Sequence, residues 1–363
     1  MVMQSPLRKP AVRPACPESG GAGGAPPHGS PIVVDGQQRR TRRTGEHVDA
    51  QDAREQVITS GPEPHGGPVV TPARRLRATA VGGVAVLLWA SLALFTTLTG
   101  RIPPFQLTAM AFAVGGLLGL PRALRGGAAL VRGLPAGAWV LGIGGLFGYH
   151  FFYFLALRNA PPVDAGLIAY LWPLLIVVFS ALLPGERLRW WHTAGAVLGL
   201  GGTFLLVTGG QGVQFRGEYL LGYVAAAVCA VVWSVYSVAN RRYPQVPTDA
   251  VAFFCLATAA LAAAAHLLFE TTVRPEGWQW LAVLALGVGP VGGAFYVWDH
   301  GTKHGDIRLL GTVSYFAPLL STALLVATGR AAASWPVAVA CVLITGGAML
   351  ASAEALRAAR RRR

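Results

Sequence analysis

The chain has 363 residues, of which 53% are hydrophobic and only 13% are charged. A soluble domain carries about 25% charged residues, so this composition excludes an ordinary soluble protein. The formal net charge of +14 leaves two interpretations, a nucleic-acid-binding protein or a membrane protein with basic links on one side. The four cysteines, Cys16, Cys229, Cys255 and Cys341, lack the spacing of a metal site or a disulfide framework.

Residues 1–73 are rich in Pro, Gly, Arg and Ser and show no apolar periodicity. A segment such as CPESGGAGGAPPHGSP cannot bury enough apolar surface to offset the entropy of its chain. The segment also lacks the apolar core of a signal peptide. We expect residues 1–73 to form a disordered cytoplasmic tail.

Apolar stretches of roughly 18–22 residues follow one another from residue 78 onward, and each is long enough to cross a bilayer as a helix. The second stretch is the least regular, because Pro103 and Pro104 shorten it. The sequence predicts an all-α integral membrane protein with ten transmembrane helices. We place them at residues 78–99, 103–120, 137–157, 163–183, 190–208, 218–239, 248–268, 278–300, 307–327 and 334–353.

Lysine and arginine alternate between the two sides of this arrangement. One set of links and termini holds 17 of these residues, and the other set holds 5. Because basic residues concentrate in cytoplasmic links, the bias predicts that both termini are cytoplasmic, including the basic C-terminus at residues 354–363. Topology accounts for the net charge, so we expect the lipid bilayer and no nucleic acid as a partner.

Shifted by 145 residues, the chain matches itself without a gap. GLIAYLWPLL at 166–175 aligns with GTVSYFAPLL at 311–320, and residues 141–206 contain 15 identities in 66 positions. Each copy holds five predicted helices, at residues 78–210 and 218–353. Because five is odd, the second copy is inverted in the membrane. Inverted repeats are typical of secondary transporters, although a channel or a membrane enzyme is an alternative.

Two segments resemble a known family: GYHFFYFLALRNAPPVDAGLIAYLWPLL and GPVGGAFYVWDHGTKHGDIRLLGTVSYFAPLLSTALL. They are similar to EamA-type members of the drug/metabolite transporter superfamily, and among these to YddG-type aromatic amino acid exporters of bacterial inner membranes. The resemblance covers residues 78–353 and implies two inverted five-helix repeats around a central cavity. It also implies export of aromatic and some other amino acids.

Aromatic and polar residues gather in the third and fourth predicted helices. Tyr149 and Tyr153 are four residues apart on one helix face, and His150 is three residues from Tyr153. Tyr170 and Trp172 lie at a similar depth in the next helix and could face them across one cavity. The resemblance implies that these five residues line the cavity. The candidates for substrate binding are Tyr149, His150, Tyr153, Tyr170, Trp172, Trp233 and Tyr315.

Each of these side chains also has a structural explanation. Tyrosine and tryptophan gather at membrane interfaces. Tyr170 and Trp172 are two residues apart, so both line one cavity only if their helix is distorted. His150 is the only ionisable group well inside a predicted helix, and it could carry protons or be a neutral packed residue. Facilitated exchange and coupling through His150 alone both remain open.

Pro173 interrupts the apolar run IAYLWPLLIVV, and Pro318 occupies the matching position of the second repeat. A proline inside a helix removes the hydrogen bond to the carbonyl four residues earlier. The affected carbonyls are those of Ala169 and Ser314. The matched defects predict two hinges, one in each repeat.

The segment VWDHGTKHGDIR at 297–308 concentrates charges at the inner end of the eighth predicted helix. A solvated loop with cytoplasmic basic residues is one interpretation. The other is an inner gate, in which Asp299 or Asp306 pairs with Lys303 or Arg308 in one conformation.

The predicted function is export of amino acids, most of all aromatic ones, through an aromatic-lined cavity. Because aromatic faces also attract cations, export of drugs, lipophilic cations or other metabolites is an alternative. An integral membrane enzyme is a further alternative, but the sequence lacks paired carboxylates, a metal-ligand set and a phosphate-binding loop. We therefore expect a small-molecule substrate, no catalytic residues, no cofactor and no metal. The oligomeric state stays open, with a monomer expected.

Overall fold

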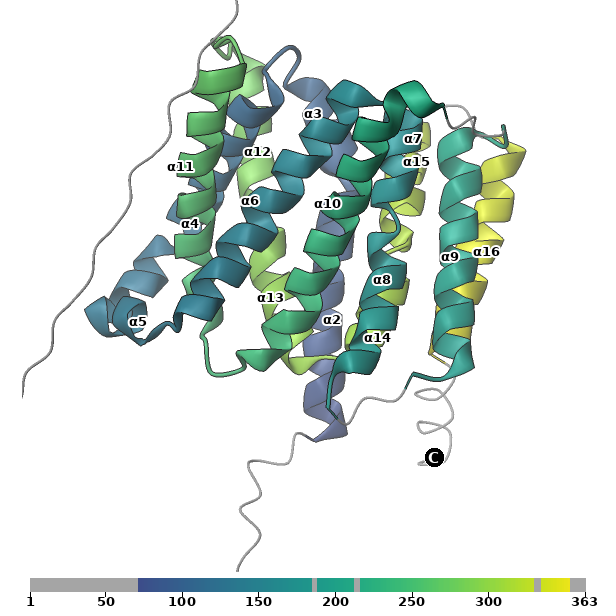
Figure 1. Ribbon diagram of the computed structural model, residues 1–363, viewed down its shortest axis with the longest axis horizontal. Helices are drawn as coiled ribbons and strands as arrows, with labels where there is room; N and C mark the ends of the chain where they lie inside the picture. The colour runs from purple at the N-terminus through teal and green to yellow at the C-terminus, as the bar shows by residue number, and fades with distance from the viewer. Residues whose placement is uncertain (1–70, 185–187, 212–215, 330–333, 353–363) are drawn as a thin grey trace, which may run out of the picture. The chain divides into compact units, whose positions relative to one another are not determined.

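The computed structural model describes residues 71–184, 188–211, 216–329 and 334–352, and the regular structure within these ranges is entirely helical. The predicted C-terminal segment and nearly all of the predicted tail lie outside these residues. The helices in Figure 1 are α2 (Pro72–Ala90), α3 (Leu92–Leu98), α4 (Pro104–Arg125), α5 (Gly127–Gly133), α6 (Ala136–Asn159), α7 (Pro162–Ala169), α8 (Trp172–Phe179), α9 (Trp190–Thr208), α10 (Leu220–Ala239), α11 (Val251–Phe269), α12 (Trp278–Val288), α13 (Gly293–His304), α14 (Ile307–Val313), α15 (Phe316–Ala327) and α16 (Trp335–Ala351).

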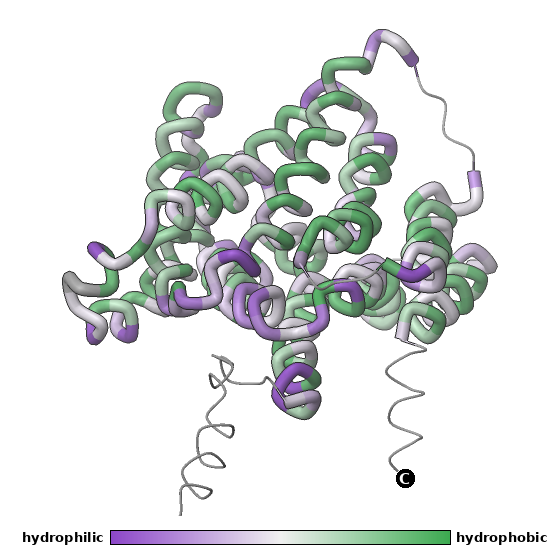
Figure 2. The backbone as a smooth tube through the Cα atoms, turned by 60° about the horizontal axis from the view of Figure 1, so that its bottom comes forward, coloured by the Kyte–Doolittle hydropathy of each residue, from purple (hydrophilic) through white to green (hydrophobic). Residues whose placement is uncertain are grey.

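Nine helical segments among the described residues are long and apolar enough to cross a membrane. A tenth apolar helix, α16, has 17 residues, which is at the lower end of the range for a transmembrane helix. Figure 2 shows hydrophobic residues along the helices and hydrophilic residues mainly at their ends and links. The chain is a multi-pass membrane protein, and the predicted fold class is confirmed.

Helix boundaries follow local backbone chemistry. Prolines occupy the first turn of α2, α4, α7, α8 and α16, where a missing N–H removes no intrahelical bond. Gly209 ends α9 in the left-handed conformation, with φ 61°, which favours glycine. Several boundaries differ from the prediction: α2 begins at Pro72 rather than at residue 78, α4 ends at Arg125 rather than at residue 120, and α13 ends at His304 rather than at residue 300.

The two repeats are interleaved. α2 to α9 form the first repeat and α10 to α16 the second, and the most extensive helix contacts join one repeat to the other: α9 with α16, α4 with α11, α6 with α10, and α2 with α13. α6 of the first repeat is equivalent to α13 of the second, and α10 is equivalent to α2. The α6–α10 contact therefore has the α13–α2 contact as its counterpart, as an inverted repeat requires. Figure 1 shows α9 and α16 side by side at one edge, and α4 and α11 at the other.

The fourth and ninth membrane segments are broken where their prolines predict. α7 ends at Ala169 and α8 begins at Trp172, one residue before Pro173. The ninth segment breaks between α14 and α15, just before Pro318. The Ser314 carbonyl that Pro318 was expected to free accepts the Ala317 N–H at 3.0 Å, because the chain tightens there into a shorter turn.

The eighth segment has a break that the prediction lacks, between α12 and α13. A Cβ on Gly292 would lie 2.5 Å from the Cα of Gly115 in α4 and would overlap the carbonyl oxygen of Gly287. Only glycine allows this close approach of two backbones. The equivalent third segment, α6, is continuous, so the two repeats differ in structure here.

Candidate functional site

Four tryptophans meet where the two repeats face each other, and we call them the tryptophan cluster. Trp89 comes from α2, Trp172 from α8, Trp233 from α10 and Trp298 from α13. Every pair of their ring centroids is between 5.0 and 6.2 Å apart, within the range of favourable aromatic contacts. The rings of Trp172, Trp233 and Trp298 are buried, with exposed fractions of 7%, 3% and 0%.

Helix α6 adds polar aromatic residues beside the tryptophan cluster. The Tyr149 ring centroid is 5.3 Å from that of Trp233, and the Tyr149 ring stacks on Tyr153 at 6.0 Å. The His150 ring lies 5.2 Å from Tyr149. His150 Nδ1 is 2.7 Å from the Leu146 carbonyl oxygen, so Nδ1 carries a hydrogen and donates it. The three α6 side chains are half-buried.

The break between α7 and α8 brings both Tyr170 and Trp172 to this region. In a regular helix, residues two apart do not share a face. Tyr170 ends α7, whereas Trp172 begins α8. The Tyr170 phenol lies within electrostatic reach of Tyr149 and Tyr153, while Trp172 packs in the tryptophan cluster. The helix distortion that the sequence required is therefore present.

Sequence reasoning missed several aromatic residues of this region, among them Trp89, Phe295 and Trp298. The Phe295 ring centroid lies 6.3 Å from that of His150. The 145-residue shift contains the signal for two of them, because Phe295 aligns with His150 and Trp298 with Tyr153. Trp89 gives a weaker signal, since the repeats match poorly in their first helices.

Two buried polar atoms here have no hydrogen-bond partner among the described residues, Trp233 Nε1 and the Tyr236 hydroxyl. The Tyr236 side chain is 2% exposed, and its ring centroid is 5.2 Å from that of Trp233. Trp298 Nε1, in contrast, donates to Ser237 Oγ at 3.1 Å. Unpaired buried polar groups are uncommon. The region therefore combines aromatic faces with spare hydrogen-bonding capacity, which suits an amphipathic small molecule.

Tyr315 lies apart from the tryptophan cluster. It is fully buried in a separate core cluster with Val177 and Ile344. The Leu174 N–H donates to its hydroxyl at 3.1 Å. The structure thus brings together six of the seven predicted substrate-binding residues and places Tyr315 elsewhere.

The predicted gate residues form two ion pairs at one end of the bundle, and the first is deeply buried. The Asp299 and Lys303 side chains are each 1% exposed, and their charged atoms are 2.8 Å apart. Thr248 and Asn240 also donate to the Asp299 carboxylate, at 2.7 and 2.9 Å. Because α13 runs to His304 and not to residue 300, these charges lie in a packed helix. The solvated-loop interpretation is wrong for this pair.

Asp306, in the link between α13 and α14, forms the second ion pair. Its carboxylate oxygens lie 3.6 Å from Arg308 and 3.5 Å from Arg75 of α2. The backbone N–H groups of Arg308 and Leu309 donate to Asp306 at 3.1 and 3.2 Å. Burial alone would raise the pKa of Asp306, but Arg75, Arg308 and these N–H groups together lower it below its usual value. A gating role for either pair stays a prediction.

A second polar cluster surrounds Glu270 at the opposite end of the bundle. The Glu270 carboxylate is 2% exposed and accepts backbone N–H groups at the start of α4, at 3.1 Å. It also lies 3.0 Å from both Arg158 and His266. The 145-residue shift aligns Arg158 with Lys303, so each end places an equivalent cation beside a buried carboxylate. Within the described ranges, no three His, Cys, Asp or Glu side chains are arranged to hold a metal ion.

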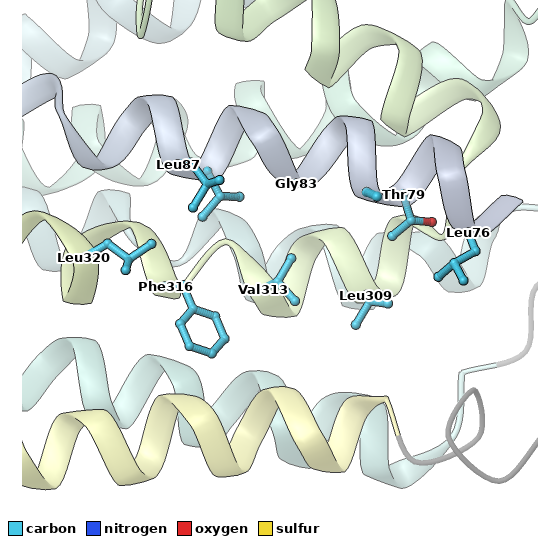
Figure 3. Close-up of a pocket in the computed structure, with 10 residues that line it drawn as sticks. Leu76, Thr79, Gly83, Leu87, Leu309, Val313, Phe316 and Leu320 are labelled. Carbon is cyan, nitrogen blue, oxygen red and sulfur yellow. The ribbon is translucent and has the colours of Figure 1, made fainter. Parts of the chain in front are cut away.

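An apolar groove of about 410 Å³ runs between α2 and the α14–α15 segment. Figure 3 shows leucine, valine and phenylalanine side chains along it. Its hydroxyl-bearing residue, Thr79, already donates to the Arg75 carbonyl and accepts the Asp306 N–H, both at 2.8 Å. A zwitterionic molecule would find no polar partner in this groove, which suits lipid chains better than a polar substrate.

Comparison with known proteins supports this architecture. The model of the EamA-like transporter family matches the chain twice, at residues 78–208 and 220–353. A protein of Ancylobacter novellus named aromatic amino acid exporter YddG is 60% identical over 287 residues, which cover 78% of this chain and 99% of that protein. The pseudopaline exporter CntI of Pseudomonas aeruginosa is 26% identical over 233 residues, which cover 61% of this chain and 77% of the exporter.

A solved crystal structure gives the same result for the fold. Its chain is 60% identical, with a TM-score of 0.75, and the match covers 78% of this chain and 99% of that one. The two family matches together take in nearly all of the described helices. On this double match and this identity, the chain belongs to the EamA-like transporter family.

Proposed function

We propose that the protein exports amino acids, aromatic ones above all, across the bacterial inner membrane by alternating access. The observation that carries this proposal is the tryptophan cluster, to which both repeats contribute rings. The name of the relative from Ancylobacter novellus supports the substrate class, because its identity of 60% extends over 99% of that protein. The bias of lysine and arginine supports cytoplasmic termini.

The substrate side chain would stack between aromatic faces, each pair contributing about 0.5–1.5 kcal/mol. Tyr149, His150, Tyr153 and Tyr170 would surround the polar end of the amino acid. The unpaired Trp233 N–H is a donor for its carboxylate. Because the tryptophan rings contact one another in this conformation, the substrate would enter only when the rings separate.

Separation of the rings needs moving elements, and we assign this motion to the broken helices. Pro173 and Pro318 would act as hinges that let α8 and α15 tilt. The gate residues Asp299, Lys303, Asp306 and Arg308 would close the cytoplasmic side in one conformation through their contacts with other elements. The contacts of Asp306 with Arg75 and of Lys303 with the Val246 carbonyl would part in the other conformation. Alternating access in an inverted repeat uses such matched rearrangements.

A second candidate is export of another small metabolite or a lipophilic cation. The relative named pseudopaline exporter favours it, since proteins of this architecture carry other cargo. Indole faces also attract cations. A competition panel separates the two functions. Phenylalanine, tryptophan and tyrosine should inhibit counterflow of labelled phenylalanine, whereas lysine and tetraphenylphosphonium should not.

The test is counterflow of labelled phenylalanine into liposomes that contain the purified protein and an internal excess of unlabelled phenylalanine. We expect Trp172→Ala to raise KM by about tenfold or more, because three ring contacts are lost. Trp190→Ala is the matched control, since Trp190 is 70% exposed and lies outside the cluster. Wild-type kinetics in Trp172→Ala would rule out this site.

A further inference from the structure

The Tyr315 side chain connects the two helix breaks by a hydrogen bond. Tyr315 is the N-cap residue of α15, at the break of the ninth segment. Leu174 lies in the first turn of α8, just after the break of the fourth segment. The Leu174 N–H donates to the Tyr315 hydroxyl at 3.1 Å, and this bond connects the two repeats.

The break itself creates the need for this bond. In an unbroken helix the Leu174 N–H would donate to the carbonyl of Tyr170, four residues earlier. The next residue does make such a bond, from the Leu175 N–H to the Leu171 carbonyl at 2.9 Å. The first N–H groups of a helix need partners from outside it, and an unpaired N–H is costly within a bilayer. The Tyr315 hydroxyl meets this need for Leu174.

The Tyr315 side chain has little freedom to change partner. It is 0% exposed, and a Cβ on Gly199 of α9 would overlap its ring. The backbones of α14 and α8 are also close, since a Cβ on Gly311 would lie 3.0 Å from the Pro173 carbonyl oxygen. The hydroxyl therefore moves only when the α14–α15 junction moves.

The equivalent tyrosine of the first repeat is used differently. Tyr170 aligns with Tyr315, but its phenol lies near Tyr149 and Tyr153 in the aromatic region. Tyr315, in contrast, contacts the partner hinge.

We propose that Tyr315 is a positioning residue that couples the two hinges. When α15 tilts against α14, the hydroxyl carries the start of α8 with it, so that both repeats change conformation together. This proposal rests on the alternating-access function proposed above. In this proposal, Tyr315 affects the rate of the conformational change and does not bind the substrate.

Tyr315→Phe removes only the hydroxyl and keeps the buried ring. We expect a several-fold lower maximal rate of phenylalanine counterflow with an unchanged KM. Hydrogen–deuterium exchange at the Leu174 amide should become about tenfold faster, the effect of losing one ordinary hydrogen bond. Tyr219→Phe is the matched control, because Tyr219 is half-buried at the start of α10 and no hydrogen bond of its hydroxyl is seen among the described residues. It should change neither quantity.

Three results would overturn the coupling: a higher KM with an unchanged maximal rate, which would make Tyr315 a substrate-binding residue; unchanged exchange at Leu174; or faster exchange with wild-type kinetics. If the wild-type protein does not transport aromatic amino acids, the proposed function fails separately. Hydrogen–deuterium exchange needs no substrate and then decides the coupling. The measurement compares exchange at the Leu174 amide and at the α7–α8 junction between the wild type and Tyr315→Phe. Thermal unfolding of both variants confirms that each is folded.

Discussion

Lys303 and Asp299 are buried together in a membrane protein, each 1% exposed, where single charges are costly. Their arrangement keeps the cost low. The Lys303 ammonium donates to the Val246 carbonyl at 2.9 Å as well as to Asp299, and two further side chains donate to the carboxylate. A charge pair this well satisfied is stable only while both partners remain.

Removing either partner should therefore be strongly destabilising. We expect Lys303→Met to lower the free energy of unfolding by about 3–5 kcal/mol, because Asp299 would remain buried without its counter-charge. The double variant Asp299→Asn/Lys303→Met should recover most of this loss. Glu218→Gln is the control, since the Arg216–Glu218 pair is 61% and 58% exposed and worth at most about 1 kcal/mol. Additive losses in the double variant, measured by unfolding in detergent, would contradict the coupling.

Much of the candidate site could be predicted from residue type and spacing. Tyr149 and Tyr153 share a helix face, His150 is three residues from Tyr153, and this spacing is visible in the sequence. The place of Tyr315 could not be predicted in this way. Its alignment with Tyr170 suggested a shared role, but its contacts depend on the glycine at position 199 and on the break in another helix.

At the scale of helices, the prolines act by position. Pro173 lies in the first turn of α8, where a proline is tolerated. The preceding helix, α7, ends at Ala169, so two residues separate it from α8. The chain therefore has two short helices in place of one long one. This could be predicted from the matched prolines. The break between α12 and α13 also has a sequence signal, Pro290, which the prediction did not use, and the glycines there allow the close approach of α4.

Pro173→Ala should restore an N–H and let α7 and α8 join. We expect an unchanged or higher melting temperature, since alanine has the higher helix propensity once α7 and α8 join. Transport should slow several-fold, because the hinge stiffens. Counterflow and thermal unfolding measured on the same preparation check both effects. Pro121→Ala in α4 is the control, since that proline lies near a helix end and away from the breaks. A wild-type turnover in Pro173→Ala/Pro318→Ala would leave packing as the role of both prolines.

At the scale of the whole molecule, the number and order of helices could be predicted because apolar length and the internal match are sequence properties. The partners of each helix could not. The strongest contacts cross between the repeats, and they depend on which small residues face one another, as Gly195 and Gly347 do in α9 and α16.

An interleaved core predicts that neither half is stable alone. Residues 1–211 and 212–363, expressed separately, should each accumulate to less than roughly a tenth of the full-length level, because most helices lose their main contacts. Co-expressed, the two halves should purify together and recover counterflow. Stable accumulation of residues 1–211 alone would show that the first repeat is an independent unit.

The contact between α9 and α16 also sets an order of events during synthesis. α9 is inserted midway through translation, whereas α16 is the last of the described helices to leave the ribosome. Until then the glycine-lined face of α9 meets lipid or a neighbouring protein. The nascent chain therefore passes through a long interval in which α9 is inserted without its main partner. Quality control in the membrane has its best opportunity in that interval, and variants that weaken α16 should lower abundance more than they lower activity per molecule.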